Sequence, residues 1–132
     1  MKYFTIAELC RSNTADRLEI NNRCRQEHVE NLAALVDNVL DPLRTWWGKP
    51  LTISSGYRCP ELNAAVKGSW TSQHMSGQAV DIDAGDRQQN KLLFEYIKKN
   101  LPFDQLIDES NFAWVHVSYR ADGNNRKQVL SL

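Results

Sequence analysis

Two short stretches of the chain carry side chains that could bind a divalent metal. In the first, His74 and Asp81 stand seven positions apart with Gly77 between them. In the second, His116 lies in the alternating run 114–118. Imidazole and carboxylate groups are common zinc ligands, and a catalytic zinc site typically has three protein ligands and a fourth position for water. The residue types therefore favour a metal site built from His74, Asp81 and His116.

Strand alternation predicts that these ligands can meet. The runs 78–84 and 114–119 have the pattern of strands, and in them Asp81 and His116 point away from the apolar positions. If the apolar positions pack against a helix, both ligands face the open side of the sheet. A glycine in the loop before the first strand lets that loop turn back, so that His74 can approach Asp81.

Other candidates have simpler interpretations. A single histidine is more often a surface or hydrogen-bonded residue than a ligand, and His28 has no partner at ligand spacing. Asp83 shares its strand face with Asp81, and we expect it to support a ligand or cap a loop.

The clearest periodicity in the chain predicts a long amphipathic helix over residues 26–47. Apolar residues recur there at three- and four-residue steps, namely Val29, Leu32, Val36, Val39, Leu43 and Trp46. Pro42 removes one backbone hydrogen bond and is expected to kink the helix near Leu40. Gly48 is expected to end it. This helix should form the apolar backing of the domain.

Shorter patterns predict the remaining elements. Thr5 and Glu8 form a capping box that should open a short helix, followed by a polar segment over 12–22 that is expected to be a loop or to contain a turn of helix. Strands are expected over 51–55, 78–84, 103–109, 114–119 and, at an edge, 127–132. Helices are expected over 60–66 and 86–100, the second with Leu92, Leu93, Tyr96 and Ile97 on its inner side. Helices first and closely spaced strands later predict an α+β fold with a small, mainly antiparallel sheet.

Composition narrows the class of protein. A length of 132 residues suits a single domain over 1–132, and 16 basic residues balance 16 acidic ones. Zero net charge gives no reason to expect a nucleic-acid partner, and no apolar run is long enough to span a membrane. We expect a monomer. The start of the chain lacks the layout of a signal peptide, so we expect synthesis in the cytoplasm and access to any extracellular target by another route, such as host lysis.

The cysteines are Cys10, Cys24 and Cys59, an odd number without a CxxC pair. This pattern argues against a disulfide framework, and reduced, structural thiols are expected.

Three longer motifs occur in a fixed order between residues 54 and 118. They read Ser54-Ser55-Gly56-Tyr57-Arg58, then Ser72-x-His74-x-x-Gly77-x-Ala79-x-Asp81-Ile82, then Trp114-Val115-His116-Val117-Ser118. This combination resembles the M15 zinc peptidases, which include D-alanyl-D-alanine carboxypeptidases and phage peptidoglycan endopeptidases.

The resemblance implies a hedgehog/D,D-peptidase-like fold with Zn²⁺ bound by His74, Asp81 and His116. It also implies that Arg58 grips a carboxylate or carbonyl of a peptide substrate, since a guanidinium fork suits carboxylates. Tyr57 and Ser72 are the further substrate-binding candidates.

The general base is where the chain departs from the M15 pattern. Many members carry an acidic residue three positions before the last histidine, and here that position is Ala113. The related zinc domain of hedgehog proteins places a glutamate farther upstream in a segment FDxxxxES, which matches residues 103–110. This match nominates Glu109 as the base, with Asp108 as the alternative. Both could instead be solvated turn residues.

The implied activity is zinc-dependent hydrolysis of peptide bonds in peptidoglycan stem peptides by a metal-activated water. The enzyme would be a carboxypeptidase or an endopeptidase, and a phage or prophage lysin acting on the cell wall fits this activity. One alternative is a non-catalytic zinc-binding recognition module of the same fold. Another is a structural metal domain with no open coordination position.

Overall fold

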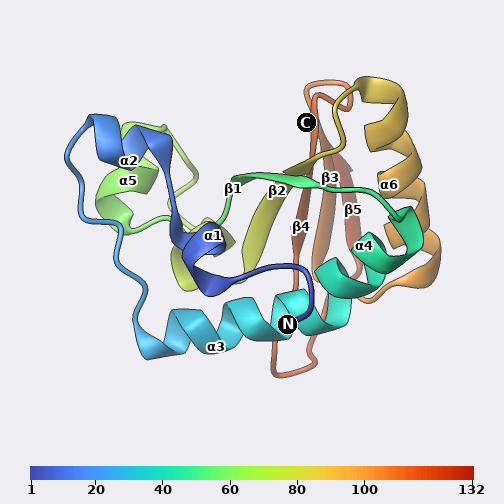
Figure 1. The fold of residues 1–132 in the computed structure, drawn as a ribbon, viewed down its shortest axis with the longest axis horizontal. Helices are drawn as coiled ribbons and strands as arrows, with labels where there is room; N and C mark the ends of the chain where they lie inside the picture. The colour runs from blue at the N-terminus through green and yellow to red at the C-terminus, as the bar shows by residue number, and fades with distance from the viewer.

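A five-stranded sheet in the order β1-β2-β4-β3-β5 runs through the computed structural model, which describes residues 1–132 (Figure 1). The strands are β1 (Thr52–Ser55), β2 (Ala79–Asp83), β3 (Gln105–Glu109), β4 (Trp114–Ser118) and β5 (Gln128–Ser131). Neighbouring strands are antiparallel except for the parallel pair β3–β5. The predicted α+β class and mainly antiparallel sheet are confirmed, with β5 at an edge.

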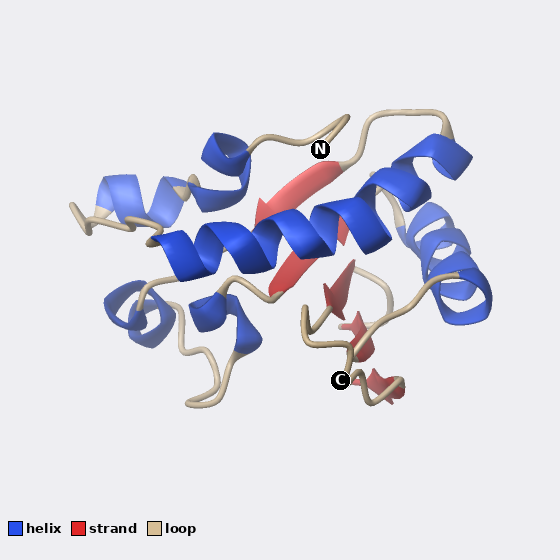
Figure 2. Cartoon of the chain, turned by 90° about the horizontal axis from the view of Figure 1, so that it is seen from below, coloured by secondary structure: helices blue, strands red, loops and turns tan.

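Helices pack beside this sheet. They are α1 (Ile6–Cys10), α2 (Asn13–Arg17), α3 (Gln26–Leu35), α4 (Asp41–Trp47), α5 (Pro60–Ala65) and α6 (Arg87–Asn100), with a π-helical turn η1 (Val36–Leu40) and a 3₁₀ turn η2 (Gln73–Ser76). The continuous rod formed by α3, η1 and α4 crosses the sheet (Figure 2). The short helices α2 and α5 lie at the far end of the molecule from α6, whereas α1 packs against α3 and β1, nearer the middle (Figure 1).

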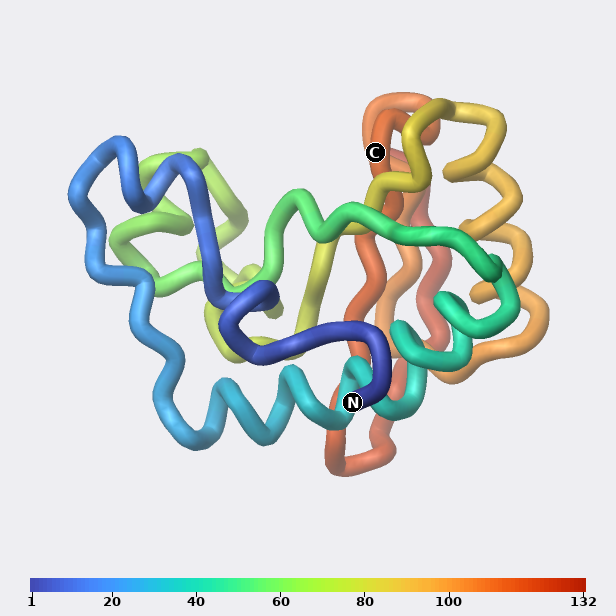
Figure 3. Tube along the Cα trace, in the orientation of Figure 1, coloured from blue at the N-terminus to red at the C-terminus, as the bar shows by residue number.

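The long helix of residues 26–47 is confirmed, and its irregularity lies where Pro42 predicts one. Just before Pro42, the Asp41 N–H donates to the carbonyl of Val36, five residues back, which defines the π turn. Gly48 ends the helix in the left-handed conformation, with φ of 74°. The start of the chain lies against this region (Figure 3), where the Met1 amine donates to Asp37 at 3.0 Å.

The core forms where this rod meets the apolar face of the sheet. The rod contributes Leu32, Leu35, Val36, Val39, Leu40 and Leu43, and the sheet contributes Val80, Ile82, Leu106, Val115 and Val117, all of them 0 % exposed. Trp46, at the end of the predicted apolar stripe, is 45 % exposed and instead stacks on Tyr96 with ring centroids 3.9 Å apart.

One predicted inward position on α6 is wrong. Leu92 is 55 % exposed, whereas Leu93 and Ile97 are buried as expected, together with Phe94 and Asn90. Positions 90, 93, 94 and 97 make one helical stripe, and Leu92 lies outside it. The prediction failed because the stripe includes a polar residue, Asn90, that an apolar pattern does not reveal.

The expectation that all cysteines are reduced is also wrong. Cys10 and Cys24 form a disulfide across 14 positions, and only Cys59 is a free thiol. An odd count leaves one cysteine over but does not prevent a pair, because pairing depends on how the intervening segment folds. That segment contains α2 and returns to the end of α1.

No helix in the structure has the length and apolar character needed to span a bilayer.

Candidate metal centre

His74, Asp81 and His116 converge on one point. One ligand atom from each lies within 4.8 Å of the other two. His74 Nε2 is 3.3 Å and His116 Nδ1 is 3.0 Å from the same Asp81 oxygen, Oδ1. The His74 side chain is 2 % exposed, and those of Asp81 and His116 are 13 % and 12 % exposed. The structure therefore brings the three predicted ligands together in a largely buried cluster.

Strand register explains how two of these ligands meet. In the antiparallel pair β2–β4, Asp81 and His116 are directly opposite each other. Their strand neighbours Val80, Val115 and Val117 are fully buried on the other face. Alternation thus places the apolar residues against the long helix and both ligands on the open face, as predicted.

The 3₁₀ turn η2 supplies the third ligand. Ser72 caps this turn by accepting a hydrogen bond from the His74 N–H at 3.2 Å. Gly77 ends the turn with φ of 74°, and a Cβ there would lie 2.7 Å from the carbonyl oxygen of His28. Glycine is therefore required both by the backbone conformation and by the close approach of α3.

A hydrogen bond to the backbone fixes the orientation and the tautomer of the His74 ring. Its Nδ1 lies 2.7 Å from the carbonyl oxygen of Gly56, which can only accept a hydrogen bond. Nδ1 must therefore carry a proton, which directs the lone pair of the neutral ring at Nε2 toward Asp81. Nε2 and the Asp81 oxygen, 3.3 Å apart, are both atoms that can bind a metal ion.

The carboxylate of Asp81 is held ionised. Burial alone raises its pKa, but hydrogen bonds from His116 and His74 lower the pKa well below its ordinary range. An ionised carboxylate and two imidazoles form a donor set that suits Zn²⁺. The residues present therefore fit a divalent metal.

Asp83 caps a loop, one of the two roles expected of it, and His28 is a hydrogen-bonded histidine, as expected of one without a partner at ligand spacing. Asp83 Oδ1 accepts from the Gly85 N–H and from Asn90 Nδ2, both at 3.0 Å, so it caps the loop after β2. His28 Nδ1 accepts a hydrogen bond from the Arg25 N–H at 3.0 Å, and its ring stacks on Tyr57.

A cleft of about 450 Å³ opens at the ligand cluster, and Arg58, Ser72 and Glu109 line it. Arg58 Nη2 donates to Ser72 Oγ at 3.3 Å, and the Arg58 backbone N–H donates to the His74 carbonyl at 3.0 Å. The Nε atom of Arg58 is buried and has no partner. Burial lowers the pKa of this guanidinium, whereas the charges of Asp81 and Glu109 raise it.

Glu109 ends β3 on the same face as the ligands. It pairs with Trp114, and Ile107, two residues earlier, pairs with His116. Burial raises the pKa of Glu109, and the negative charge of Asp81 raises it further. A raised pKa brings a carboxylate closer to the range in which it can both accept and donate a proton near neutral pH.

Two other candidates lie outside the cleft. Asp108 pairs with the buried Val115 and accepts a hydrogen bond from Ser131 Oγ at 2.7 Å, so it belongs to the opposite face. Tyr57 is 4 % exposed and stacks on His28 with ring centroids 4.4 Å apart. It packs in the core, so the expected role of Tyr57 in binding substrate finds no support in its position.

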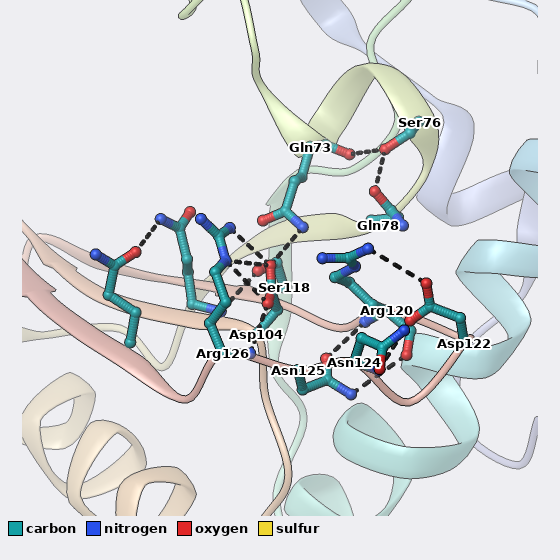
Figure 4. A network of polar contacts seen from close by, with 12 residues as sticks. Gln73, Ser76, Gln78, Asp104, Ser118, Arg120, Asp122, Asn124, Asn125 and Arg126 are labelled. Atoms are coloured by element: carbon teal, nitrogen blue, oxygen red, sulfur yellow. Dashed lines mark hydrogen bonds and ion pairs between the residues drawn. The ribbon is translucent and has the colours of Figure 1, made fainter.

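An ion pair next to η2, between the buried Asp104 and the half-exposed Arg126, was not predicted as part of the site (Figure 4). Asp104 is 0 % exposed and accepts from Arg126 Nη2 at 2.7 Å and from Gln73 Nε2 at 2.8 Å. Gln73 directly precedes His74, so this network ties the histidine turn to the start of β3. The motif match at residues 103–110 includes Asp104 but gives it no role, and Arg126 lies too far along the chain for a local pattern.

Comparison with known proteins agrees with this geometry. The family model described as Peptidase M15 matches residues 2–118, which is most of the chain and includes all three candidate ligands. No curated protein matches the chain. Membership in this family implies a metallopeptidase with a peptide substrate. From the extent of the match, the chain belongs to the Peptidase M15 family.

Proposed function

We propose that this protein is a zinc-dependent peptidase that hydrolyses peptide bonds in peptidoglycan stem peptides. The observation that carries the proposal is the shared cleft: the His74, Asp81 and His116 cluster opens to the same space as a cationic Arg58 and a carboxyl group, Glu109, with a raised pKa. A metal site, an anion-binding group and a proton-transfer group are the parts that metal-assisted hydrolysis requires.

The three ligands would hold the metal through His74 Nε2, the Asp81 carboxylate and the His116 ring. When bound, zinc lowers the pKa of water and polarises a carbonyl group. The hydrogen bond from His74 Nδ1 to the Gly56 carbonyl keeps that ring in the orientation and tautomer that ligation needs.

Arg58 would hold the peptide. Its buried Nε–H lacks a partner, and an unsatisfied buried donor is costly unless a ligand supplies an acceptor. A carboxylate or carbonyl of the substrate is such an acceptor, and Ser72 Oγ, already bonded to Arg58 Nη2, would hold the guanidinium in place beside it. Stem peptides, with their free carboxylates, match this requirement.

Glu109 would transfer the proton. As the base it accepts a proton from the attacking water, and it then donates this proton to the amine that leaves. Its position on the same sheet face as His116 and its raised pKa both support this role.

The proposed substrate lies outside the cytoplasm. The Cys10–Cys24 disulfide supports action there, because disulfides persist in oxidising compartments. A lysin of phage or prophage origin that reaches the cell wall fits both features.

Purified muropeptides test the proposal. The zinc-loaded protein should release either terminal D-alanine or the products of cross-link cleavage, and a chelator should stop the reaction. Glu109→Gln keeps the shape of the side chain and removes its basicity, so turnover should fall by about 10²-fold or more with zinc content unchanged. Asp108→Asn, on the other face, is the matched control and should have the smaller effect. If Asp108→Asn abolishes hydrolysis and Glu109→Gln does not, Asp108 is the base.

Ala113 favours a second candidate, a zinc-binding module that recognises peptides without cleaving them. It stands where many M15 members carry an acidic residue. Such a module would bind muropeptides with an affinity that depends on Arg58, release no product, and be unaffected by Glu109→Gln. Measuring binding and hydrolysis on the same preparations separates the two functions.

A further inference from the structure

The backbone around Arg58 is held by a residue that lies 36 positions earlier in the chain. Asn22 Nδ2 donates to the carbonyl of Tyr57 at 2.9 Å, and Asn22 Oδ1 accepts from the Cys59 N–H at 2.7 Å. These two bonds lie on either side of Arg58. One side chain therefore fixes the peptide units before and after the arginine.

The same amide group is anchored to a covalent link. Asn22 Nδ2 also donates to the carbonyl of Cys10 at 2.9 Å, and Cys10 is bonded to Cys24, two residues after Asn22. The disulfide thus closes the segment that carries Asn22 onto the end of α1. Without it, the ordering of residues 11–24 would cost more conformational entropy.

Arg58 needs this support because its own contacts with the fold are few. Its backbone N–H donates to the His74 carbonyl, and its side chain makes one hydrogen bond, at 3.3 Å, to Ser72. It lies in the irregular segment between β1 and α5, where no strand pairing fixes the backbone. Besides the bond from the Tyr57 N–H to the Leu9 carbonyl at 2.8 Å, the Asn22 contacts supply what a regular element would otherwise provide.

We infer that Asn22, kept in place by the Cys10–Cys24 disulfide, is a positioning residue for Arg58. It acts through the backbone on both sides of the arginine and does not touch the cleft. The function of this contact rests on the proposed role of Arg58 in holding the peptide. Opening the disulfide should then weaken peptide binding without affecting the metal ligands.

The first measurement tests the contact itself and needs no activity. In zinc-loaded protein, Asn22→Ala should shift the NMR signal of Arg58 Nε–H and speed hydrogen exchange of the Cys59 amide by about tenfold or more. Asn38→Ala is the matched control, because Asn38 makes one side-chain bond to a backbone carbonyl on the exposed side of the long helix. It should change neither signal. If Asn22→Ala leaves both signals unchanged, the inference is overturned.

The second measurement tests the link to the peptide. Asn22→Ala should raise KM for a muropeptide about tenfold and change kcat less than twofold, with zinc content unaltered. In an Arg58→Ala background the same substitution should have no further effect on KM, because the group it positions is gone. A full KM effect that persists in that background would show that Asn22 does not act through Arg58.

The disulfide offers an independent variant should Asn22→Ala fail to fold. A trialkylphosphine reduces the bond: the disulfide gains two electrons and two protons, and the phosphine becomes its oxide with the oxygen of one water. Reduced protein and the Cys10→Ser/Cys24→Ser variant should both reproduce the Arg58 Nε–H shift and the higher KM. Unchanged signals in both would overturn the inference. If the signals move but wild-type protein cleaves no muropeptide, the positioning role stands and the proposed peptidase function fails.

Discussion

The buried carboxylate of Asp104 makes a contribution to stability that should depend on pH. Burial alone raises its pKa, but hydrogen bonds from Arg126 and Gln73 lower the pKa from 3.8 to about 2. The folded protein therefore binds this proton less tightly than the unfolded chain does. The stabilisation is fully present above the unfolded pKa and is lost as the pH falls toward about 2.

The size of the effect follows from the shift and from the exposure of the partner. A change from 3.8 to about 2, at about 1.4 kcal/mol per pKa unit, gives at most about 2.5 kcal/mol. The Arg126 side chain is 51 % exposed, so solvent screens the pair and about 1–2 kcal/mol is a better expectation. The linkage relation predicts that about half of this is lost by pH 3.

Urea unfolding of metal-free protein at pH 7, 5, 4 and 3 measures this contribution. Asp104→Asn should cost about 1–2 kcal/mol at pH 7, and the difference from wild type should shrink steadily below pH 5. Asp122→Asn is the control, because Asp122 also pairs with an arginine, Arg120, but its side chain is 52 % exposed. This substitution should change the free energy of unfolding little. A cost for Asp104→Asn that is the same at pH 7 and pH 3 would refute the reasoning, because the loss would then come from packing and not from charge.

Three further outcomes are expected. Elemental analysis should find one zinc per chain, and His74→Ala and His116→Ala should each lose it; retention of stoichiometric metal in both variants would refute the ligand set. Arg58→Lys should impair hydrolysis with little loss of melting temperature, because lysine cannot reproduce the guanidinium fork; a large fall in melting temperature with normal turnover would make Arg58 structural. Asn90→Ala should lower the free energy of unfolding in urea by about 3 kcal/mol, and a loss below about 1 kcal/mol would contradict this account. The reason is that Asn90 is 0 % exposed, accepts a hydrogen bond from the Ala84 N–H and donates to the carbonyls of residues 112 and 113.

The shared face of Asp81 and His116 could be predicted because strand alternation depends only on local sequence. Apolar neighbours identify the buried face, and the ligands then take the other one. The register of the β2–β4 pair, which places Asp81 directly opposite His116, could not be predicted from local sequence. The turn that delivers His74 was recognisable from Gly77, whose backbone conformation favours glycine.

The parts that could not be predicted are contacts between distant segments. The Asp104–Arg126 pair joins residues 22 positions apart, and the Asn22 contact with Cys59 joins residues 37 positions apart. Neither pair has a local pattern, since single polar residues in loops are usually solvated. The packing of Tyr57, a substrate-binding candidate of the motif at residues 54–58, likewise depends on a segment distant in the sequence. Tyr57 packs against His28.

Ala113 stands where many M15 members carry an acidic residue, but the acidic residue Glu109 lies close to this position in the fold. Ala113 and Glu109 close the same turn between β3 and β4, and the Ala113 N–H donates to the Glu109 carbonyl at 3.0 Å. The residues between them, 110–112, all have positive φ, an arrangement that costs energy for residues other than glycine. Asn90 holds this turn, because its Nδ2 donates to the carbonyls of Phe112 and Ala113. A carboxylate on Glu109 therefore starts from the neighbouring strand of the same hairpin, beside the position that many M15 members use.

If the turn is what aims that carboxylate, Asn90→Ala should lower turnover as well as stability. Glu109→Gln in the Asn90→Ala background should then reduce turnover by a smaller factor than it does in wild type. Equal costs in both backgrounds would mean that the turn supports the fold and has no part in aiming Glu109.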